Sequence, residues 1–328
     1  MEFKYDPIPF IFERGDPFTK LCVLEMVDLC HTQLGDRLLL DLLKTQRKDG
    51  GFPSQIDSKL SGVKETERIA NLLLRCEMPK DGLALSSCMK FILKHQTEEG
   101  GFQENPKLNI PESINWLSNQ KGVTWLTGDM VDFLRLMEQE NTKACQKAIN
   151  WLRRMELPIG GWGVMEEEEL VDPDSSAQIT FLMKDLLGEE DTLFKRGIEL
   201  YEKHLDQMVI DAEQGFYYWS EKKVETDVYH LTHLLGQSFF SGKRSADAGY
   251  DVNDERIKKM VEGIIKTQRE DGGFRPYWSQ ESDPWYTGLV LKIFIWIGTM
   301  EKEKIKSMIE KVDLKELIRK DSISSKEG

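Results

Sequence analysis

The chain has 328 residues, of which 57 are acidic and 44 basic, so its formal net charge at pH 7 is −13. No cluster of lysine or arginine recurs on one face, and the acidic balance argues against nucleic acid or an anionic membrane as a partner. The five cysteines (Cys22, Cys30, Cys76, Cys88 and Cys145) show no Cys-x-x-Cys spacing, so we expect reduced core residues of an intracellular protein. With no secretory signal and no apolar run long enough to span a bilayer, we expect a cytoplasmic protein without a transmembrane segment.

The first part of the chain predicts an arm followed by helices. Residues 1–15 are rich in proline and aromatic residues, and we expect them to be irregular. Asp16 and Pro17 then begin a helix over residues 16–29, since an aspartate N-cap with proline in the first turn is a common helix start. A second helix is expected over residues 38–46.

Further along, apolar and charged helices alternate. The apolar helices are expected near residues 66–76, 124–137, 175–187, 227–240 and 284–297, and more charged ones over residues 190–204 and 253–268. A last helix is expected over residues 302–320. The polar tail, residues 321–328, is expected to fray.

A seven-residue phrase follows several of these helices. Residues 46–52, 96–102 and 268–274 share the pattern Gln-x-x-x-Gly-Gly-Phe, and residues 156–162 and 207–216 are weaker copies that end in Gly-Gly-Trp and Gly-Phe. The second glycines fall at 51, 101, 161, 215 and 273, in steps of 50, 60, 54 and 58 residues. A step of this length holds two helices with their loops, and the recurrence predicts a repeat architecture. Paired glycines supply the positive φ of a sharp helix exit.

The phrase resembles the QW repeat of the terpenoid cyclase and protein prenyltransferase superfamily, whose helical hairpins close into an α/α toroid. Landmarks at residues 13–17, 125–128, 160–162 and 229–230 also resemble small single-toroid prenyltransferase or squalene-oxidase repeat proteins. The resemblance implies an all-α fold, with one α/α-toroid domain over residues 1–320. The apolar helices would form its inner ring and the charged helices its outer ring. Segments from the two termini would supply the hairpin that closes the ring.

Residues 172–177 read Asp-Pro-Asp-Ser-Ser-Ala and resemble the D-x-D-D-T-A motif of class II terpenoid cyclases. In that family the middle aspartate protonates an alkene or epoxide inside an apolar cavity, and Asp174 takes its position. Asp172 and His230 are the further catalytic candidates. Ser175 replaces the last motif aspartate, which departs from the family pattern. The alternative is that Asp172 and Pro173 cap a helix and Asp174 lies in its first turn.

The starts of the inner helices would surround one mouth of a central cavity, where the helix dipoles suit an anion. Aromatic side chains there offer apolar area and π faces, so we expect an elongated isoprenoid ligand. The same aromatic residues would serve equally well as core packing. The candidate substrate-binding residues at these starts are Trp125, Thr127, Gln178, Asp227, Tyr229, His233, Asp283, Trp285 and Tyr286.

Residues 227–230 read Asp-Val-Tyr-His, similar to the segment that carries the zinc-binding histidine of prenyltransferase β subunits. Those enzymes also need an Asp-x-Cys pair, and none of the five cysteines lies in one, so no metal and no cofactor are predicted. Three functions stay open. The chain is a cyclase-like or prenyltransferase-like protein that binds an isoprenoid and starts cyclisation by protonation, a non-catalytic toroid that binds a partner protein, or a β-subunit-like component of a prenyltransferase.

Overall fold

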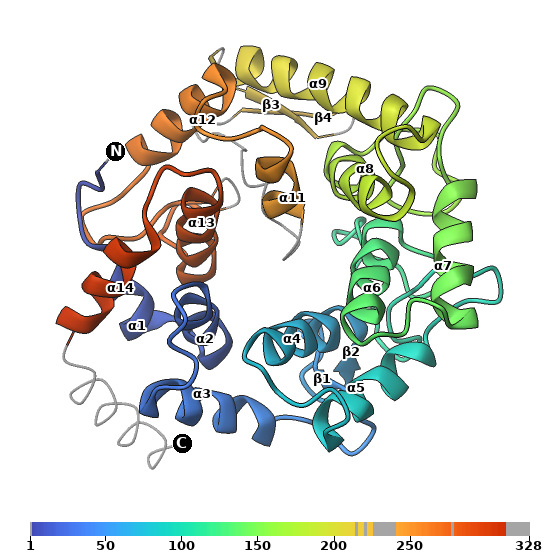
Figure 1. The fold of residues 1–328 in the computed structure, drawn as a ribbon, viewed down its shortest axis with the longest axis horizontal. Helices are drawn as coiled ribbons and strands as arrows, with labels where there is room; N and C mark the ends of the chain where they lie inside the picture. The colour runs from blue at the N-terminus through green and yellow to red at the C-terminus, as the bar shows by residue number, and fades with distance from the viewer. Residues whose placement is uncertain (1, 214–215, 220–221, 226–240, 277–278, 313–328) are drawn as a thin grey trace.

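The computed structural model describes residues 2–213, 216–219, 222–225, 241–276 and 279–312, and its helices lie in two concentric rings (Figure 1). The inner ring contains α2 (Pro17–Met26), α4 (Val63–Arg75), α6 (Thr124–Leu136), α8 (Pro173–Leu187), α11 (Ser241–Asp247) and α13 (Pro284–Trp296). Outside them lie α1 (Pro7–Arg14), α3 (Gln33–Lys44), α5 (Leu83–Leu93), α7 (Lys143–Arg154), α9 (Thr192–Glu213), α12 (Glu255–Lys266) and α14 (Lys302–Lys311).

The predicted all-α toroid is confirmed. The inner helices are buried on most sides and the outer helices mainly on one face, but the predicted split into apolar and charged helices is not uniform, since the inner α4 is rich in charged residues and the outer α5 is largely apolar. The bounds of α4, α6, α8 and α13 agree with the predicted inner helices to within three residues, whereas the helix predicted over residues 227–240 lies outside the described residues. Two helices show the difference in burial. In α13 every residue from Tyr286 to Phe294 is buried, while α12 buries one face, through Ile257, Met260, Val261, Gly263 and Ile264.

The expectation of an irregular arm over residues 1–15 is wrong, because residues 7–14 form α1. The carboxylate of Asp6 accepts a hydrogen bond from the N–H of Ile8 at 2.9 Å, and Pro7 occupies the first turn. This is the same start signal as Asp16 and Pro17. The buried side chains of α1 pack against α13 and make it part of the outer ring.

The N-terminal helices close the ring, as predicted for residues 16–29. In the inner ring α2 packs between α13 and α4. The C-terminal helix α14 lies further out, where Lys302 pairs with Asp28 beyond the end of α2. The segment that follows α14 lies outside the described residues.

Three of the five phrases form the same turn. The Nε2 atoms of Gln46, Gln96 and Gln268 donate at 3.0 Å to the carbonyl of the first glycine, at Gly50, Gly100 and Gly272. Each also donates to a carbonyl at the start of an outer helix, at Ala84 (2.9 Å), Ala144 (2.8 Å) and Tyr5 (2.8 Å). Each phrase therefore ties one outer helix to another.

The aromatic residue of the phrase makes a second contact, with the inner ring. Its backbone N–H donates to a hydroxyl in the first turns of an inner helix. The pairs are Phe52 with Thr66 (2.9 Å), Phe102 with Thr127 (2.8 Å), Trp162 with Ser176 (2.8 Å) and Phe274 with Thr287 (2.9 Å). The hydroxyl residue is thus part of the repeat.

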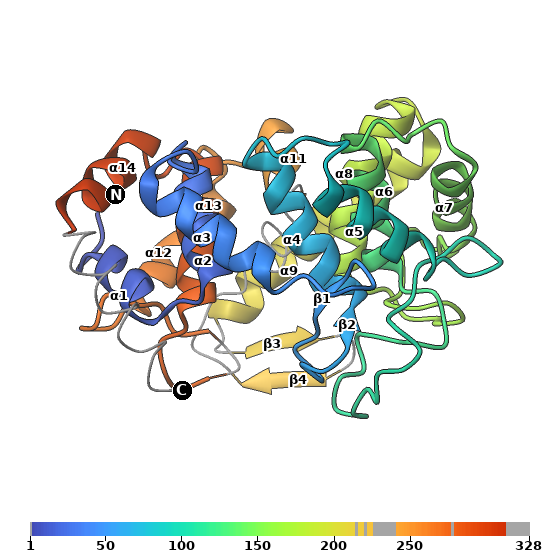
Figure 2. The ribbon, with the colours of Figure 1, turned by 90° about the horizontal axis from the view of Figure 1, so that it is seen from below.

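The two weaker copies differ from the turn. Glu156 replaces the glutamine of the third copy and pairs with Arg196 of α9, whose Nε donates to it at 2.8 Å. Gln207 of the fourth copy lies inside α9, which continues to Glu213. An antiparallel hairpin of β3 (Phe216–Trp219) and β4 (Lys222–Glu225) follows, on the same face of the ring as β1 (Phe52–Pro53) and β2 (Ser61–Gly62) (Figure 2). Gly215 of this copy lies outside the described residues.

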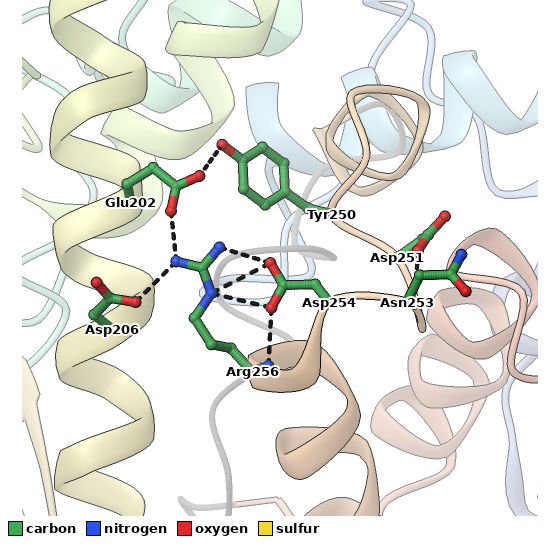
Figure 3. A network of polar contacts seen from close by, with 7 residues as sticks. All are labelled: Glu202, Asp206, Tyr250, Asp251, Asn253, Asp254 and Arg256. Carbon is green, nitrogen blue, oxygen red and sulfur yellow. Dashed lines mark hydrogen bonds and ion pairs between the residues drawn. The ribbon is translucent and has the colours of Figure 1, made fainter.

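A network of charged residues joins the outer helices α9 and α12 (Figure 3). Arg256 of α12 donates from Nη1 to Asp206 of α9 at 2.8 Å and from Nη2 to Asp254 at 2.6 Å. The Tyr250 hydroxyl donates to Glu202 of α9 at 2.6 Å, and Glu202 also accepts from Arg256. The network joins α9 to α12. In the sequence, α9 precedes the β3–β4 hairpin and α12 follows it.

Candidate functional site

Buried polar side chains gather where the inner helices α4, α6 and α8 pack together. Glu67 of α4 is 2% exposed, Asp129 of α6 is 4% and Gln178 of α8 is 6%. The Nε2 of Gln178 donates to Oδ1 of Asp129 at 2.7 Å and to the carbonyl of Trp125 at 3.0 Å. Acidic residues are seldom buried this deeply, so the group is a candidate functional site. We call Glu67, Asn71, Asp129 and Gln178 the central polar cluster.

Glu67 is the residue of this cluster that is best placed to carry a proton. Its pKa lies well above the usual value, because burial penalises the carboxylate and the neighbouring charge of Asp129 repels it, against the opposing effect of Arg68. Asn71, one turn along α4, donates its amide to Oε1 of Glu67 and orients the carboxyl group. A carboxyl with a raised pKa beside a second carboxyl is an arrangement suited to general acid–base chemistry.

A partly buried ion-pair network lies next to the cluster. Arg244 of α11 donates from Nη1 to Oδ2 of Asp132 on α6 at 2.7 Å and from Nε to Oδ2 of Asp185 on α8 at 2.6 Å. Burial opposes the charge of Arg244, but the two carboxylates outweigh it and raise the pKa of the guanidinium. This network ties α11 to α6 and α8, and Asp132 adds to the negative charge that raises the pKa of Glu67.

The motif aspartates occupy the start of α8, and neither is part of the central polar cluster. Asp172 is the N-cap, and its carboxylate accepts the N–H of Ser175 at 2.7 Å. Asp174 is half-buried in the first turn. Burial lowers the pKa of His204 on α9, and Asp174 lies close enough to oppose this shift in part. It shares a helix face with Phe181, whose ring packs on Tyr201 of α9 with centroids 5.0 Å apart. Asp174 therefore faces the outer ring, and its catalytic role stays a prediction.

The other predicted site residues divide into four groups. Gln178 belongs to the central polar cluster. Thr127 makes the repeat contact with Phe102 and donates to the carbonyl of Val123 at 2.7 Å, so its hydroxyl is used within the fold. Asp227, Tyr229, His230 and His233 lie outside the described residues.

The predicted aromatic residues lie at the starts of α6 and α13. Trp125 is half-buried and donates from Nε1 to the carbonyl of Trp116 at 2.9 Å. Asp283 caps α13 by accepting the N–H of Tyr286 at 2.7 Å, and Tyr286 is only 1% exposed. Trp285 is half-buried and stacks on Phe18 of α2, with ring centroids 5.5 Å apart. Substrate binding by these residues stays a prediction.

Glu67 and Asp129 lie at inner-helix starts that the sequence placed around the mouth of the cavity, but neither was among the predicted catalytic or substrate-binding residues. The signal that could have found them is a carboxylate inside a helix that the repeat assigns to the inner ring, where most positions are buried. Within the described residues, no group of three or more His, Cys, Asp or Glu side chains is arranged to hold a metal ion. No helix in that part of the chain is long and apolar enough to cross a membrane.

Comparison with known proteins places the fold. No protein-family model matches the chain, and no curated protein does. A novel α-amylase from Clostridium perfringens superposes with a TM-score of 0.56 and 14% identity, over 86% of this chain and 86% of that chain. A single-residue variant of the type II terpene cyclase MstE from Scytonema, in complex with its substrate geranylgeranyl dihydroxybenzoate, superposes with a TM-score of 0.51 and 14% identity. The match covers 87% of this chain and 88% of that chain. A family 76 glycoside hydrolase from a bovine Bacteroides thetaiotaomicron strain superposes with a TM-score of 0.51 and 12% identity, over 88% of this chain and 69% of that chain. The chain therefore has the α/α-toroid fold that its repeats predicted, shared with a terpene cyclase and a glycoside hydrolase.

Proposed function

We propose that the protein is an enzyme that binds a small molecule at the central polar cluster and transfers a proton to it from Glu67. The observation that carries the proposal is the buried carboxyl of Glu67, with its raised pKa, the orienting amide of Asn71 and the neighbouring charge of Asp129. Asp129 is the second carboxyl of the pair and would accept or relay a proton. Such a perturbed carboxyl pair is more typical of an active site than of a structural core.

The chemistry of the cluster favours a polar substrate. An isoprenoid chain would offer no hydrogen-bond partner to the side chains of Glu67, Asn71 and Gln178, whereas a polyol would. Glycoside hydrolysis generally uses two carboxyl groups, one of them with a raised pKa as the general acid. Among the similar structures are an α-amylase and a family 76 glycoside hydrolase, and this likeness supports a glycoside as the substrate class.

A second candidate is proton-initiated cyclisation of an isoprenoid. It is favoured by the stacked pair of Phe18 and Trp285 at the inner ring and by the likeness to a type II terpene cyclase. Here too the acid would be Glu67, because Asp174 faces α9. A partner-binding toroid has weaker support, because the exposed large apolar side chains come from separate segments of the described chain. They are Tyr5, Leu40, Leu83, Ile159, Leu170 and Ile210.

Turnover of aryl glycosides and of polyprenyl substrates by wild type and Glu67→Gln tests the proposal. The variant keeps the size of the side chain and an acceptor for the Asn71 amide but cannot transfer a proton. We expect kcat to fall by about 10²–10⁴-fold. Glu262→Gln, at an exposed position of α12, makes the same change away from the site and should leave kcat unchanged. Asp174→Asn should also leave it unchanged.

Two results would count against the proposal. Equal turnover by wild type and Glu67→Gln would remove Glu67 from the mechanism. No turnover by wild type on either class of substrate would favour a non-catalytic binding protein.

A further inference from the structure

Arg68 lies on α4 directly after Glu67, at the place where α2, α4 and α13 pack together. Its guanidinium carbon is 6.0 Å from the ring centroid of Trp285 on α13. Trp285 in turn stacks on Phe18 of α2 with an interplanar angle of 29°. The side chain of Arg68 is half-buried. The guanidinium thus has an aromatic ring near it, and the buried carboxyl of Glu67 is one residue away in the chain.

Arg68 differs from Arg75 and Arg244 of the inner ring because it forms no ion pair within the part of the chain that the structure describes. Arg75, two turns further along α4, pairs with Glu25 of α2 at 2.6 Å, and Arg244 pairs with Asp132 and Asp185. Among the described residues Arg68 makes neither a hydrogen bond nor an ion pair, and its guanidinium lies near the ring of Trp285. A guanidinium carries five N–H donors, so a half-buried one is suited to bind an acceptor from outside the protein.

Two lysines lie close enough to Arg68 for its charge to lower their pKa values. Lys64, one turn earlier on α4, pairs with Glu65 at 3.1 Å, and burial lowers its pKa, with Arg68 as a further cause. The pKa of Lys292 on α13 is lowered by burial and then by Arg75, and Arg68 contributes again. Arg68 thus lies among basic side chains of α4 and α13 in a chain of net charge −13.

We propose that Arg68 binds an oxyanion of the substrate, a carboxylate or a phosphate group, beside the face of Trp285 and next to Glu67. The planar guanidinium matches two oxygens of either group, and a charge-assisted pair of this kind is stronger than a neutral hydrogen bond. The proposal deepens the proposed function by naming an anionic substrate, such as a sugar acid or a sugar phosphate. Only the identity of the reacting group, Glu67, is taken from the proposed function.

Calorimetric titration with glucuronate and, separately, with inorganic phosphate tests the site, with sodium chloride held at matched ionic strength. We expect saturable binding of at least one probe to wild type, and the better probe identifies the source of the oxyanion. Arg68→Gln should weaken its binding by about tenfold or more. Arg153→Gln removes the same charge from an exposed position of α7 and should bind as wild type does. Arg68→Lys keeps the charge but loses the planar fork, and we expect intermediate affinity.

Saturable binding that survives in Arg68→Gln would overturn the proposal, and so would the absence of binding of both probes to wild type. Glu67→Gln separates this outcome from the failure of the proposed function. If the anion site is correct, that variant still binds the probe, whether or not wild type turns over any substrate.

Discussion

The side-chain amide of Gln268 joins the two ends of the described chain. Its Nε2 donates to the carbonyl of Tyr5 at 2.8 Å, while its Oε1 accepts the N–H of Lys4 at 2.8 Å and that of Tyr5 at 3.2 Å. The side-chain amides of Gln46 and Gln96 also donate to backbone carbonyls, but these lie on outer helices that follow them in the sequence. In the last repeat the N-terminal helix α1 stands where that outer helix would be, so the ring closes through a contact that local sequence cannot make.

Replacing Gln268 should loosen the N-terminal segment. Gln268→Ala leaves the backbone groups of Lys4 and Tyr5 without their partner, and we expect the free energy of unfolding to fall by about 2–4 kcal/mol, at roughly 1 kcal/mol for each lost hydrogen bond. Limited proteolysis should then cut the segment before α2. Gln96→Ala removes the matching contact inside the chain and should not expose this segment. Equal N-terminal cleavage in both variants would contradict the closing role of Gln268.

A side chain at position 272 should lower the stability of the protein more than a side chain at position 188, where the glycine has the same backbone conformation. Gly272 has φ +87°, and a Cβ there would lie 2.3 Å from the carbonyl oxygen of Asp6. Gly188 has φ +88°, with nothing within 4 Å of a Cβ. Both Gly→Ala variants carry the cost of positive φ, about 1 kcal/mol, but only Gly272→Ala must also push α1 away. Chemical denaturation should show the larger loss for Gly272→Ala, and equal losses would refute the clash.

Lys292 should make stability rise with pH above neutrality. Burial, and then Arg75, lower its pKa from 10.5 to about 7. Between these values the unfolded chain binds more protons than the folded one, so the free energy of unfolding increases with pH, by at most about 1.4 kcal/mol per unit. Below about pH 7 the folded amine is charged as well, and the destabilising effect is at its full value.

Lys292→Met keeps an unbranched buried side chain without the charge, so it should raise stability at pH 7 and flatten the rise. Urea unfolding at several pH values between 7 and 10 measures both effects. Lys90→Met, at an exposed position of α5, should leave the pH dependence as in wild type. If the free energy of unfolding still rises with pH in Lys292→Met, another titratable group causes the rise.

The thiols should be unreactive until the protein unfolds. All five cysteines are buried, and burial raises the pKa of Cys88 to about 12 and that of Cys145 to about 11. The pKa of Cys22 is raised further by burial, and that of Cys76 by its hydrogen bond with the Cys30 thiol and by burial. Because the thiolate is the nucleophile, alkylation near neutral pH should be at least about a hundredfold slower than in denaturant. Mass spectrometry of the labelled native protein measures this, and rapid native labelling would contradict it.

Sequence reasoning succeeded where neighbours along the chain decide the structure. The phrases at Gln46, Gln96 and Gln268 placed the turns, because a glycine exit and an amide that ties helix ends are local devices. It failed for α1, although Asp6 and Pro7 carry the same start signal as Asp16 and Pro17. Fifteen residues rich in proline suggested an irregular arm, and the burial of Phe10 and Phe12 depends on α13, which lies at the other end of the chain.

The sequence by itself determined the architecture, since the repeat length and the alternation of apolar and charged helices are sufficient to predict two rings. Only the tertiary structure decided which acidic side chains lie at the centre. Glu67 and Asp174 both occupy the first turns of inner helices, yet Glu67 lies beside α6 and Asp174 faces α9. A helix buried on nearly all sides has no single apolar face to reveal its rotation, so its direction is set by the packing of α4 and α8 against their neighbours.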